Sequence, residues 1–451
     1  MKPPTLHGPA ADFALAALFL HPTDVRLETV RRAAERVELW DGVVPALERH
    51  GVAVLAHRNA ELAGVEPPPS AREAWEERAA ALREDALRFR LTLLRLVDAL
   101  AAVGIEPTLL KGASLALDLY PEPALRGQGD LDVLVEPGEV RAAVRAGEAA
   151  GLLPPEQSLP TWWYRWAHFH LKLAPSSPLL REVELHWALH HPSLLLTPDP
   201  AALQSRREAR ELAGRRVWSL DPLDRLLHLV THLVSHAHGL PGEPDRAALR
   251  AVVEHPDHPL RLKWVLDVHA EVERVHAELP AERLAERARE WSAEGQLAWC
   301  LRWVRGALGL AGSAEGWADE FLGLLAPPDR ARRLRATGAG PLPGLDFRAG
   351  SLTRLGRWIW PPSAYLERRY RGRGPLGARR WSHAARALAR AALGGGALPL
   401  AMLGSAALRR GRRRKLRRAQ APERVLDLAA AWRSVQSEPA PSSPTRRSSS
   451  S

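Results

Sequence analysis

The chain has 451 residues, of which 46% are hydrophobic and 25% are charged, close to ordinary globular usage. This composition excludes a wholly disordered protein and leaves room for two or three domains. The single cysteine, Cys300, excludes a disulfide framework and any zinc site built from several thiolates. Asp12 interrupts the first apolar run, and no cleavage site of a signal peptide follows it, so the expected location is the cytoplasm.

The net charge of +11 is unevenly distributed along the chain. Residues 348–451 contain 23 basic and 4 acidic residues, whereas residues 1–347 contain 40 basic and 48 acidic residues. The body of the protein is therefore mildly acidic, which argues against a nucleic-acid binder overall. Only 5 of the 63 basic residues are lysines, and two of these, Lys111 and Lys263, fall in the motifs described below.

Residues 10–66 have apolar positions at helical spacing and predict helices. A proline-rich stretch at 67–70 separates them from a long amphipathic helix that begins near Ala71 and is closed by Gly104. The apolar stripe of this helix, spaced mainly by threes and fours, consists of Leu82, Phe89, Leu93, Leu96, Leu100 and Val103.

Between residues 105 and 190 the pattern changes to short strands that alternate with helices. The predicted strands are 106–110, 130–135, 169–173 and 182–189. Residues 200–345 return to helical periodicity. We therefore predict an α+β protein whose small mixed β-sheet core is flanked by N-terminal and C-terminal helical regions. The predicted divisions are a helical region, the sheet core, a helical domain, a basic region and a disordered tail, at 1–100, 101–195, 196–347, 348–435 and 436–451.

Asp130 and Asp132 lie two positions apart in an apolar strand, so both carboxylates project from one face. Adjacent anions near a core repel each other unless a cation neutralises them, and oxygen ligands suit Mg²⁺ or Mn²⁺. Glu184, on a later strand, would add a third carboxylate to this face. Three carboxylates can hold two metal ions that activate a hydroxyl and stabilise a leaving pyrophosphate. The alternative is a pair of solvated aspartates at a strand end.

The turn at 111–114 joins a predicted strand to a helix. Backbone N–H groups at the start of a helix, together with the Lys111 ammonium and the Ser114 hydroxyl, would receive oxygens of a triphosphate. The alternative is an ordinary turn at Gly112 beside an exposed lysine.

These motifs, taken in order, resemble those of uncharacterised bacterial nucleotidyltransferases of the DNA polymerase beta-like superfamily. The resemblance covers about residues 25–375, including the stretch 360–374. The residues that carry it are Leu110-Lys111-Gly112, Arg126, Asp130 and Asp132, Glu184-Leu185-His186-Trp187, His228 and His232, and Arg261-Leu262-Lys263-Trp264 with Asp267. Two positions depart from the superfamily pattern: its Gly-Ser pair is Gly112-Ala113-Ser114 here, and the third carboxylate belongs to a glutamate.

The resemblance implies a metal-dependent nucleotidyltransferase that moves a nucleoside monophosphate from a nucleoside triphosphate to an unidentified hydroxyl acceptor. The residues expected to bind the metal ions and act in catalysis are Asp130, Asp132 and Glu184. Arg126 would neutralise charge that develops during transfer. The residues expected to hold the β- and γ-phosphates are Lys111, Gly112 and Ser114. The residues expected around the site are His186, His232, Lys263 and Asp267.

Several histidines admit two interpretations. His228, His232 and His236 share one helical face, a spacing that suits a transition metal, but neither a thiolate nor the glutamate of a zinc protease accompanies them. Packing is therefore the favoured interpretation. His168 and His170 alternate on a strand and either line a cleft or are solvated.

Two further motifs also stay open at this point. Lys263 and Asp267, four residues apart on a helix, form either a salt bridge or part of the site. The tryptophan-rich run at 161–169 either stacks bases or packs, and the acidic body favours packing.

The basic region contains an uncharged stretch at 391–408 followed by a polybasic cluster at 409–418. Four glycines and a proline in the uncharged stretch argue against a membrane-spanning helix. The cluster favours peripheral contact with an anionic membrane, with RNA as the alternative. The rival interpretation of the protein is thus a non-catalytic nucleotide-binding or scaffold protein anchored by this region. A degenerate relative of that kind is expected to lose one of the three carboxylates, and this chain keeps all three.

Overall fold

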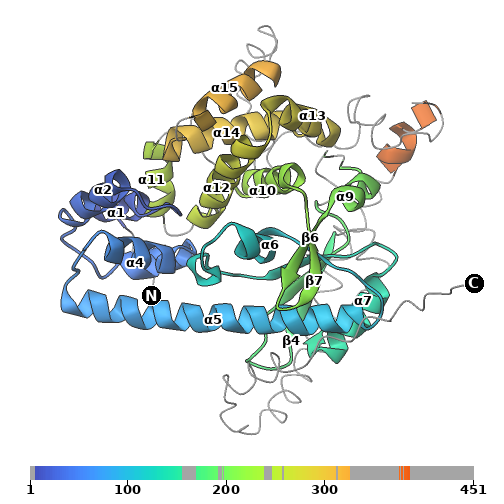
Figure 1. Ribbon diagram of the computed structural model, residues 1–451, viewed down its shortest axis with the longest axis horizontal. Coiled ribbons are helices and arrows are strands. Elements are labelled where there is room, and N and C mark those ends of the chain that lie inside the picture. The colour runs from blue at the N-terminus through green and yellow to red at the C-terminus, as the bar shows by residue number, and fades with distance from the viewer. Residues whose placement is uncertain are drawn as a thin grey trace, which may run out of the picture.

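The computed structural model describes residues 6–154, 169–190, 196, 198–237, 246–255, 258–310, 313–325, 375, 377–378 and 380–385. Within these residues the chain has an α+β fold with a seven-stranded mixed sheet (Figure 1). The predictions made for His168, most of the tryptophan-rich run, the stretch 360–374 and the polybasic cluster concern residues outside this description. None of the described helices is long and apolar enough to cross a membrane.

Helices form the N-terminal part of the chain, as the apolar spacing predicted. They are α1 (Pro9–Ala16), α2 (Asp24–Ala34), α3 (Val43–Arg49) and α4 (Ala53–Leu62). Local chemistry sets their ends: Thr23 caps α2 by accepting a hydrogen bond from the backbone N–H of Arg26 at 3.3 Å.

The long helix α5 (Pro69–Ala101) begins with a proline in its first turn, where no N–H is needed. Phe89, Leu93, Leu96 and Leu100 are buried, as their spacing predicted. Val103, which we placed on the same stripe, is instead 52% exposed, because the helix ends two residues before it.

The sheet has the strand order β3-β4-β5-β2-β1-β7-β6. Its strands are β1 (Thr108–Leu109), β2 (Leu131–Leu134), β3 (Leu152–Leu153), β4 (His170–Pro175), β5 (Val183–His186), β6 (Glu208–Leu212) and β7 (Arg215–Ser219). The four predicted strands are all present: three are shorter than predicted, and the fourth, β4, starts one residue later and ends two residues later than predicted. The prediction of helices throughout 200–345 is wrong at β6 and β7, which form a hairpin. Ala213 and Gly214 both have positive φ there (49° and 77°), as a two-residue hairpin turn requires.

The two faces of the sheet differ in chemistry because side chains alternate along each strand. On one face the apolar residues of β2, β4 and β5 pack against the second half of α5 and against α7 (Val140–Ala149). The other face carries the charged and histidine side chains of the same strands, and it faces α6 (Lys111–Asp118) and α10 (Pro222–His236) across a cavity.

The later helices form a second hydrophobic core together with the N-terminal helices. Besides α10 they are α9 (Pro200–Arg206), α11 (Arg246–Glu254), α12 (Leu262–Glu278), α13 (Ala281–Trp291), α14 (Glu294–Leu308) and α15 (Ser313–Leu325); a short 3₁₀ helix, η1 (Pro123–Leu125), precedes β2. Figure 1 shows α10–α15 on the side of the molecule opposite α5, with α6 between them. Segments far apart in the sequence thus frame the polar face of the sheet.

Candidate active site

A cavity of about 470 Å³ lies between the polar face of the sheet and helices α6, α10 and α12. The sequence-predicted site residues that line it are Lys111, Gly112, Arg126, Asp130, Asp132, Glu184, His232 and Lys263. Segments spread over about 150 residues of chain therefore meet in one place.

Three carboxylates gather at the sheet side of the cavity. β2 and β5 run parallel with Asp132 directly opposite Glu184, so these side chains are neighbours on one face. Asp130 immediately precedes β2 and also lines the cavity. Burial, together with the charges of Asp132 and Glu184, raises the pKa of Asp130 above its ordinary value. Such crowding of anions is what a bound cation would relieve.

Two basic side chains already contact these carboxylates. Lys111 Nζ lies 2.6 Å and His186 Nε2 lies 2.9 Å from Oδ1 of Asp132. Burial opposes ionisation of Asp132, but the charges and hydrogen bonds of Lys111 and His186 hold its pKa below the usual range. His186 Nε2 is also 3.5 Å from Oε2 of Glu184. Lys111 is not the exposed lysine of the alternative interpretation, because its side chain is only 14% exposed.

The first residue of α6 has an unusual backbone conformation. Lys111 has a φ of +43°, the left-handed region that a residue with a side chain seldom adopts. At Gly112 a Cβ atom would overlap with the guanidinium of Arg126, so only glycine permits this approach. The N-terminal end of α6, with the partial positive charge of the helix dipole, adjoins the cavity at Lys111 and Gly112.

Arg126 is fixed by α12. Its Nε and Nη2 donate to Oδ1 and Oδ2 of Asp267 at 2.9 and 2.8 Å, and the Tyr120 hydroxyl donates to Oδ1 at 2.7 Å. Arg126 and Asp267 are almost completely buried. Asp267 therefore positions Arg126 from outside the cavity.

Lys263 does not take Asp267 as its hydrogen-bond partner. Its Nζ instead donates to the carbonyl oxygen of Gly127 at 2.8 Å. Burial and the nearby Arg126 lower the pKa of Lys263 to about 8. Of the two interpretations of Lys263 and Asp267, the structure therefore favours the one in which both residues belong to the site, and not the one in which they form a salt bridge with each other.

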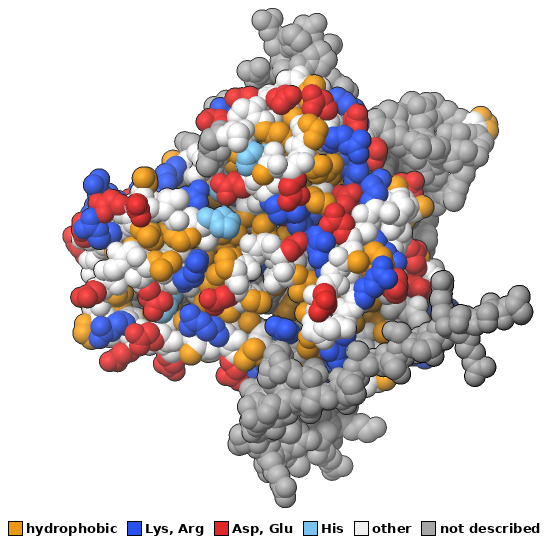
Figure 2. Space-filling view, in the orientation of Figure 1, with side chains coloured by type: hydrophobic (Ala, Val, Ile, Leu, Met, Phe, Trp, Pro, Cys, Tyr) orange, Lys and Arg blue, Asp and Glu red, His pale blue; other side chains and the backbone are white. Residues whose placement is uncertain are grey.

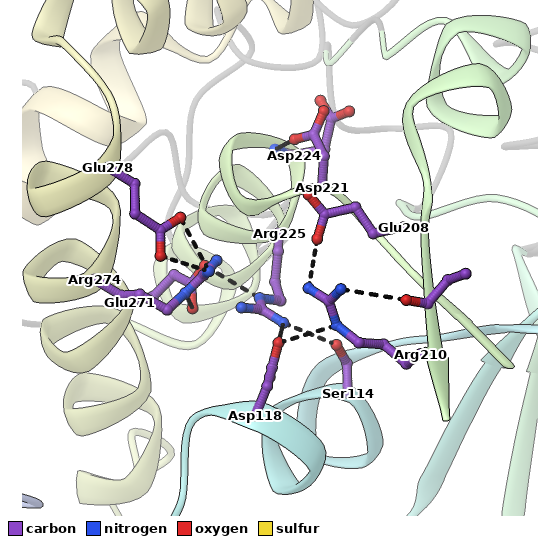
Figure 3. A network of polar contacts seen from close by, with 11 residues as sticks. Ser114, Asp118, Glu208, Arg210, Asp221, Asp224, Arg225, Glu271, Arg274 and Glu278 are labelled. Atoms are coloured by element: carbon purple, nitrogen blue, oxygen red, sulfur yellow. Dashed lines mark hydrogen bonds and ion pairs between the residues drawn. The ribbon is translucent and has the colours of Figure 1, made fainter. Parts of the chain in front are cut away.

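Ser114 is the predicted phosphate-binding residue that the structure does not bring to the cavity. It is buried, and Nη1 of Arg225 donates to its hydroxyl at 3.3 Å. Arg225 also pairs with Asp118 at 2.8 Å and with Glu271 at 3.1 Å, which links α6 to α10 and α12 (Figure 3). Sequence reasoning missed Arg225, since an arginine on an amphipathic helix gives no sign of burial.

Histidines and an aromatic ring form the opposite wall. His228, His232 and His236 line the cavity next to Trp264, and the His232 and His236 rings lie 4.9 and 4.6 Å from the Trp264 ring. Burial and neighbouring positive charges lower the pKa of His228 and His232 well below the ordinary value, so both are neutral near pH 7. The contacts of these histidines with Trp264 agree with the packing interpretation. Their rings also face the cavity.

His190 and His170 complete the set of cavity histidines. His190 was missed by sequence reasoning; it follows the acidic-Leu-His-Trp element by three residues and lies 3.3 Å from the Thr231 hydroxyl. His170 lines the cavity and is not the solvated residue of the alternative interpretation.

A family model for uncharacterised nucleotidyltransferases matches residues 37–309, which is more than half of the chain and includes every residue that lines the cavity. Comparison with curated proteins and with solved structures found no match. The chain therefore belongs to the family of uncharacterised nucleotidyltransferases.

Proposed function

We propose that the protein is a metal-dependent enzyme of the DNA polymerase beta-like superfamily that transfers a nucleoside monophosphate from a nucleoside triphosphate to a hydroxyl acceptor. The observation that carries the proposal is the carboxylate face of β2 and β5 at one end of a cavity, with Lys111 and the start of α6 beside it.

The residues present fit a divalent cation. Asp130, Asp132 and Glu184 supply only oxygen atoms, the donors that Mg²⁺ and Mn²⁺ prefer, and burial followed by the charges of Asp132 and Glu184 raises the pKa of Asp130. A bound cation would supply charge neutralisation at the triphosphate and favour ionisation of the acceptor hydroxyl.

The chain's own residues have distinct tasks in this proposal. Lys111 and the N–H groups at the start of α6 bind the β- and γ-phosphates. Asp267 holds Nε and Nη2 of Arg126, and Nη1, which lies beside Gly112 and donates to Oε1 of Gln128 at 3.3 Å, meets charge that develops on the transferred phosphoryl group. The histidine wall of α10 and Trp264 narrow the cavity and exclude water from the reacting groups.

The same proposal covers the protein's partners and location. The nucleoside triphosphate and one hydroxyl acceptor are its substrates, the protein works in the cytoplasm, and its basic C-terminal residues contact an anionic membrane surface. The predicted sheet core at 101–195 leaves out β6 and β7, which belong to the same sheet but lie beyond residue 195.

The test is incubation of the purified protein with Mg²⁺, a cell extract and ATP, CTP, GTP or UTP, each labelled at the α-phosphate. We expect label to move to one acceptor class, and the Asp130→Asn variant to give none. Equal labelling by the variant, or labelling that is insensitive to chelation of Mg²⁺, would contradict the proposal. Nucleotide binding without any transfer would support the scaffold alternative.

A further inference from the structure

We propose that His170, Glu184 and His186 form a binding site for a transition-metal dication of the series from Mn²⁺ to Zn²⁺, beside the all-oxygen site of Asp130 and Asp132. This inference rests on the proposed function in that both sites share one cavity and one residue, Glu184.

The strand register places these three side chains together. β4 and β5 are antiparallel, and His170 lies directly opposite His186. Glu184 precedes His186 by two residues, so it projects from the same face of β5. His170 Nε2 is 3.8 Å from one Glu184 carboxylate oxygen, and His186 Nε2 is 3.5 Å from the other. Among the described residues, this is the group of three potential ligands whose atoms all lie within 4.8 Å of one another.

The donor set decides which metals the group would take. Two imidazole nitrogens and one carboxylate suit Zn²⁺, Fe²⁺, Co²⁺ and Mn²⁺, whereas Mg²⁺ demands oxygen ligands. Three protein ligands also leave coordination positions open for a substrate oxygen. The Nε2 atoms of His170 and His186 are the ring nitrogens that face Glu184, and the buried Nδ1 atoms have no hydrogen-bond partner among the described residues, so no protein acceptor fixes the tautomer of either ring.

Glu184 is free to change partners. Its Oε1 atom is 3.2 Å from Nζ of Lys172, which also binds Glu182 at 2.7 Å. Lys172 is half exposed and keeps Glu182 when Glu184 turns to a metal. A cation between the two histidines and Glu184 would also draw Nε2 of His186 from Asp132, which keeps Lys111 at 2.6 Å as its cationic partner.

The experiment titrates tag-free, chelator-treated full-length protein with Co²⁺ in the presence of excess Mg²⁺. Co²⁺ in a nitrogen-containing site of low coordination number absorbs visible light strongly, whereas Co²⁺ in an octahedral oxygen site absorbs weakly. We expect a strong band that saturates at one equivalent and that Mg²⁺ does not remove. His170→Gln and His186→Gln should each weaken Co²⁺ binding by about tenfold or more. His170 is the better test of the two, because its side chain is 23% exposed and its replacement leaves the core intact.

Two variants serve as controls. Asp130→Asn should leave the Co²⁺ band unchanged, because Asp130 belongs to the oxygen site. His232→Gln should also leave it unchanged, and loss of the band in this variant would place the metal on α10 and overturn the proposal. A band that is absent, or that persists in both His170→Gln and His186→Gln, overturns it as well. Mg²⁺-dependent transfer without the band refutes this inference alone, and the band without any transfer refutes the proposed function alone.

Discussion

At the scale of single residues, Asp130 and Asp132 have opposite electrostatic surroundings although only one residue separates them. Lys111 and His186 both contact Asp132, whereas Asp130 lies mainly near other carboxylates. The same substitution at the two positions should therefore change stability in opposite directions.

We expect Asp130→Asn to raise the free energy of unfolding in metal-free buffer, because it removes an ionised group whose pKa is raised by burial and by like charges. Asp132→Asn should lower it by about 3–5 kcal/mol, because it leaves buried Lys111 and His186 without their carboxylate. Both variants should lose transfer activity. Urea unfolding without metal measures the stabilities, and equal shifts for the two variants would contradict this account.

Substitutions of Lys111 and Arg126 should affect different kinetic parameters. Lys111→Ala should raise KM for the nucleotide by about tenfold or more, since it would remove the charged hydrogen bond to phosphate that we propose for Lys111. Arg126→Lys keeps a positive charge opposite Asp267 but loses the bidentate geometry, so kcat should fall by about 10²-fold. Steady-state assays at varied nucleotide concentration decide between these effects. If neither parameter changes, both residues have only structural roles.

His50 should make the protein sensitive to acid. It is 1% exposed, and burial together with Arg49, Arg261 and His258 lowers its pKa to about 3. Below the unfolded-state pKa of about 6.5 only the unfolded chain binds this proton, so the free energy of unfolding decreases as the pH falls from there toward 3.

His50→Leu removes that loss. Relative to the wild type, its free energy of unfolding should gain about 1.4 kcal/mol between pH 7.5 and pH 5.5, as measured by urea unfolding. The comparison at pH 7.5, where His50 is neutral in both states, isolates the packing effect. A difference that does not change with pH would show that His50 binds its proton equally well in both states.

At the scale of elements, a buried ionic network holds α6 against α10 and α12. Arg225 is 2% exposed and Glu271 is fully buried, and the pair connects to Asp118 on α6 (Figure 3). Removing one member of such a pair leaves a buried charge without its partner.

Arg225→Met should therefore cost about 3 kcal/mol of unfolding free energy, the lower end for a broken buried pair, because Glu271 keeps Arg274. The matched control is Arg78→Met, whose partner Glu48 is on the surface, with side chains 41% and 37% exposed. That change should cost less than about 1 kcal/mol. Similar losses in the two variants would show that burial does not distinguish the pairs.

At the scale of the whole molecule, the face drawn in Figure 2 shows Lys, Arg, Asp and Glu side chains interspersed, without a region of one sign that dominates it. The basic excess lies in residues 348–451, whereas the proposed site residues lie between 111 and 267. Catalysis and surface attachment should therefore be separable.

Deletion of residues 376–451 should leave nucleotide binding unchanged and abolish co-sedimentation with anionic vesicles. Wild-type binding to vesicles should weaken with added salt, since each basic residue near the surface contributes about 1 kcal/mol at low salt. Replacement of Arg412, Arg413 and Arg414 by serine in the full chain should give intermediate binding. Undiminished vesicle binding by the truncated chain would refute the anchor, and binding of RNA without vesicle binding would favour the nucleic-acid alternative.

The sequence alone was sufficient for features that depend on local periodicity. Apolar spacing predicted α5 and α10, and the period of two predicted one face for Asp130 and Asp132, which both line the cavity although β2 begins only at Leu131. It failed at β6 and β7, because these two arginine-rich strands, of which β6 is the edge strand of the sheet, lack a continuous apolar pattern. It also failed at Val103, since periodicity does not show where a helix stops.

Contacts between distant segments were decided only by the tertiary structure. The register of β2 with β5 placed Asp132 opposite Glu184. Packing of α12 brought Asp267 into contact with Arg126, which is 141 residues away in the sequence. The same packing turned Ser114 toward Arg225 and away from the cavity. Periodicity reports which face of an element is buried but not which partner covers it. The residue types of the candidate site could therefore be predicted from the sequence. Which of these residues contact each other depends on how the helices pack against the sheet.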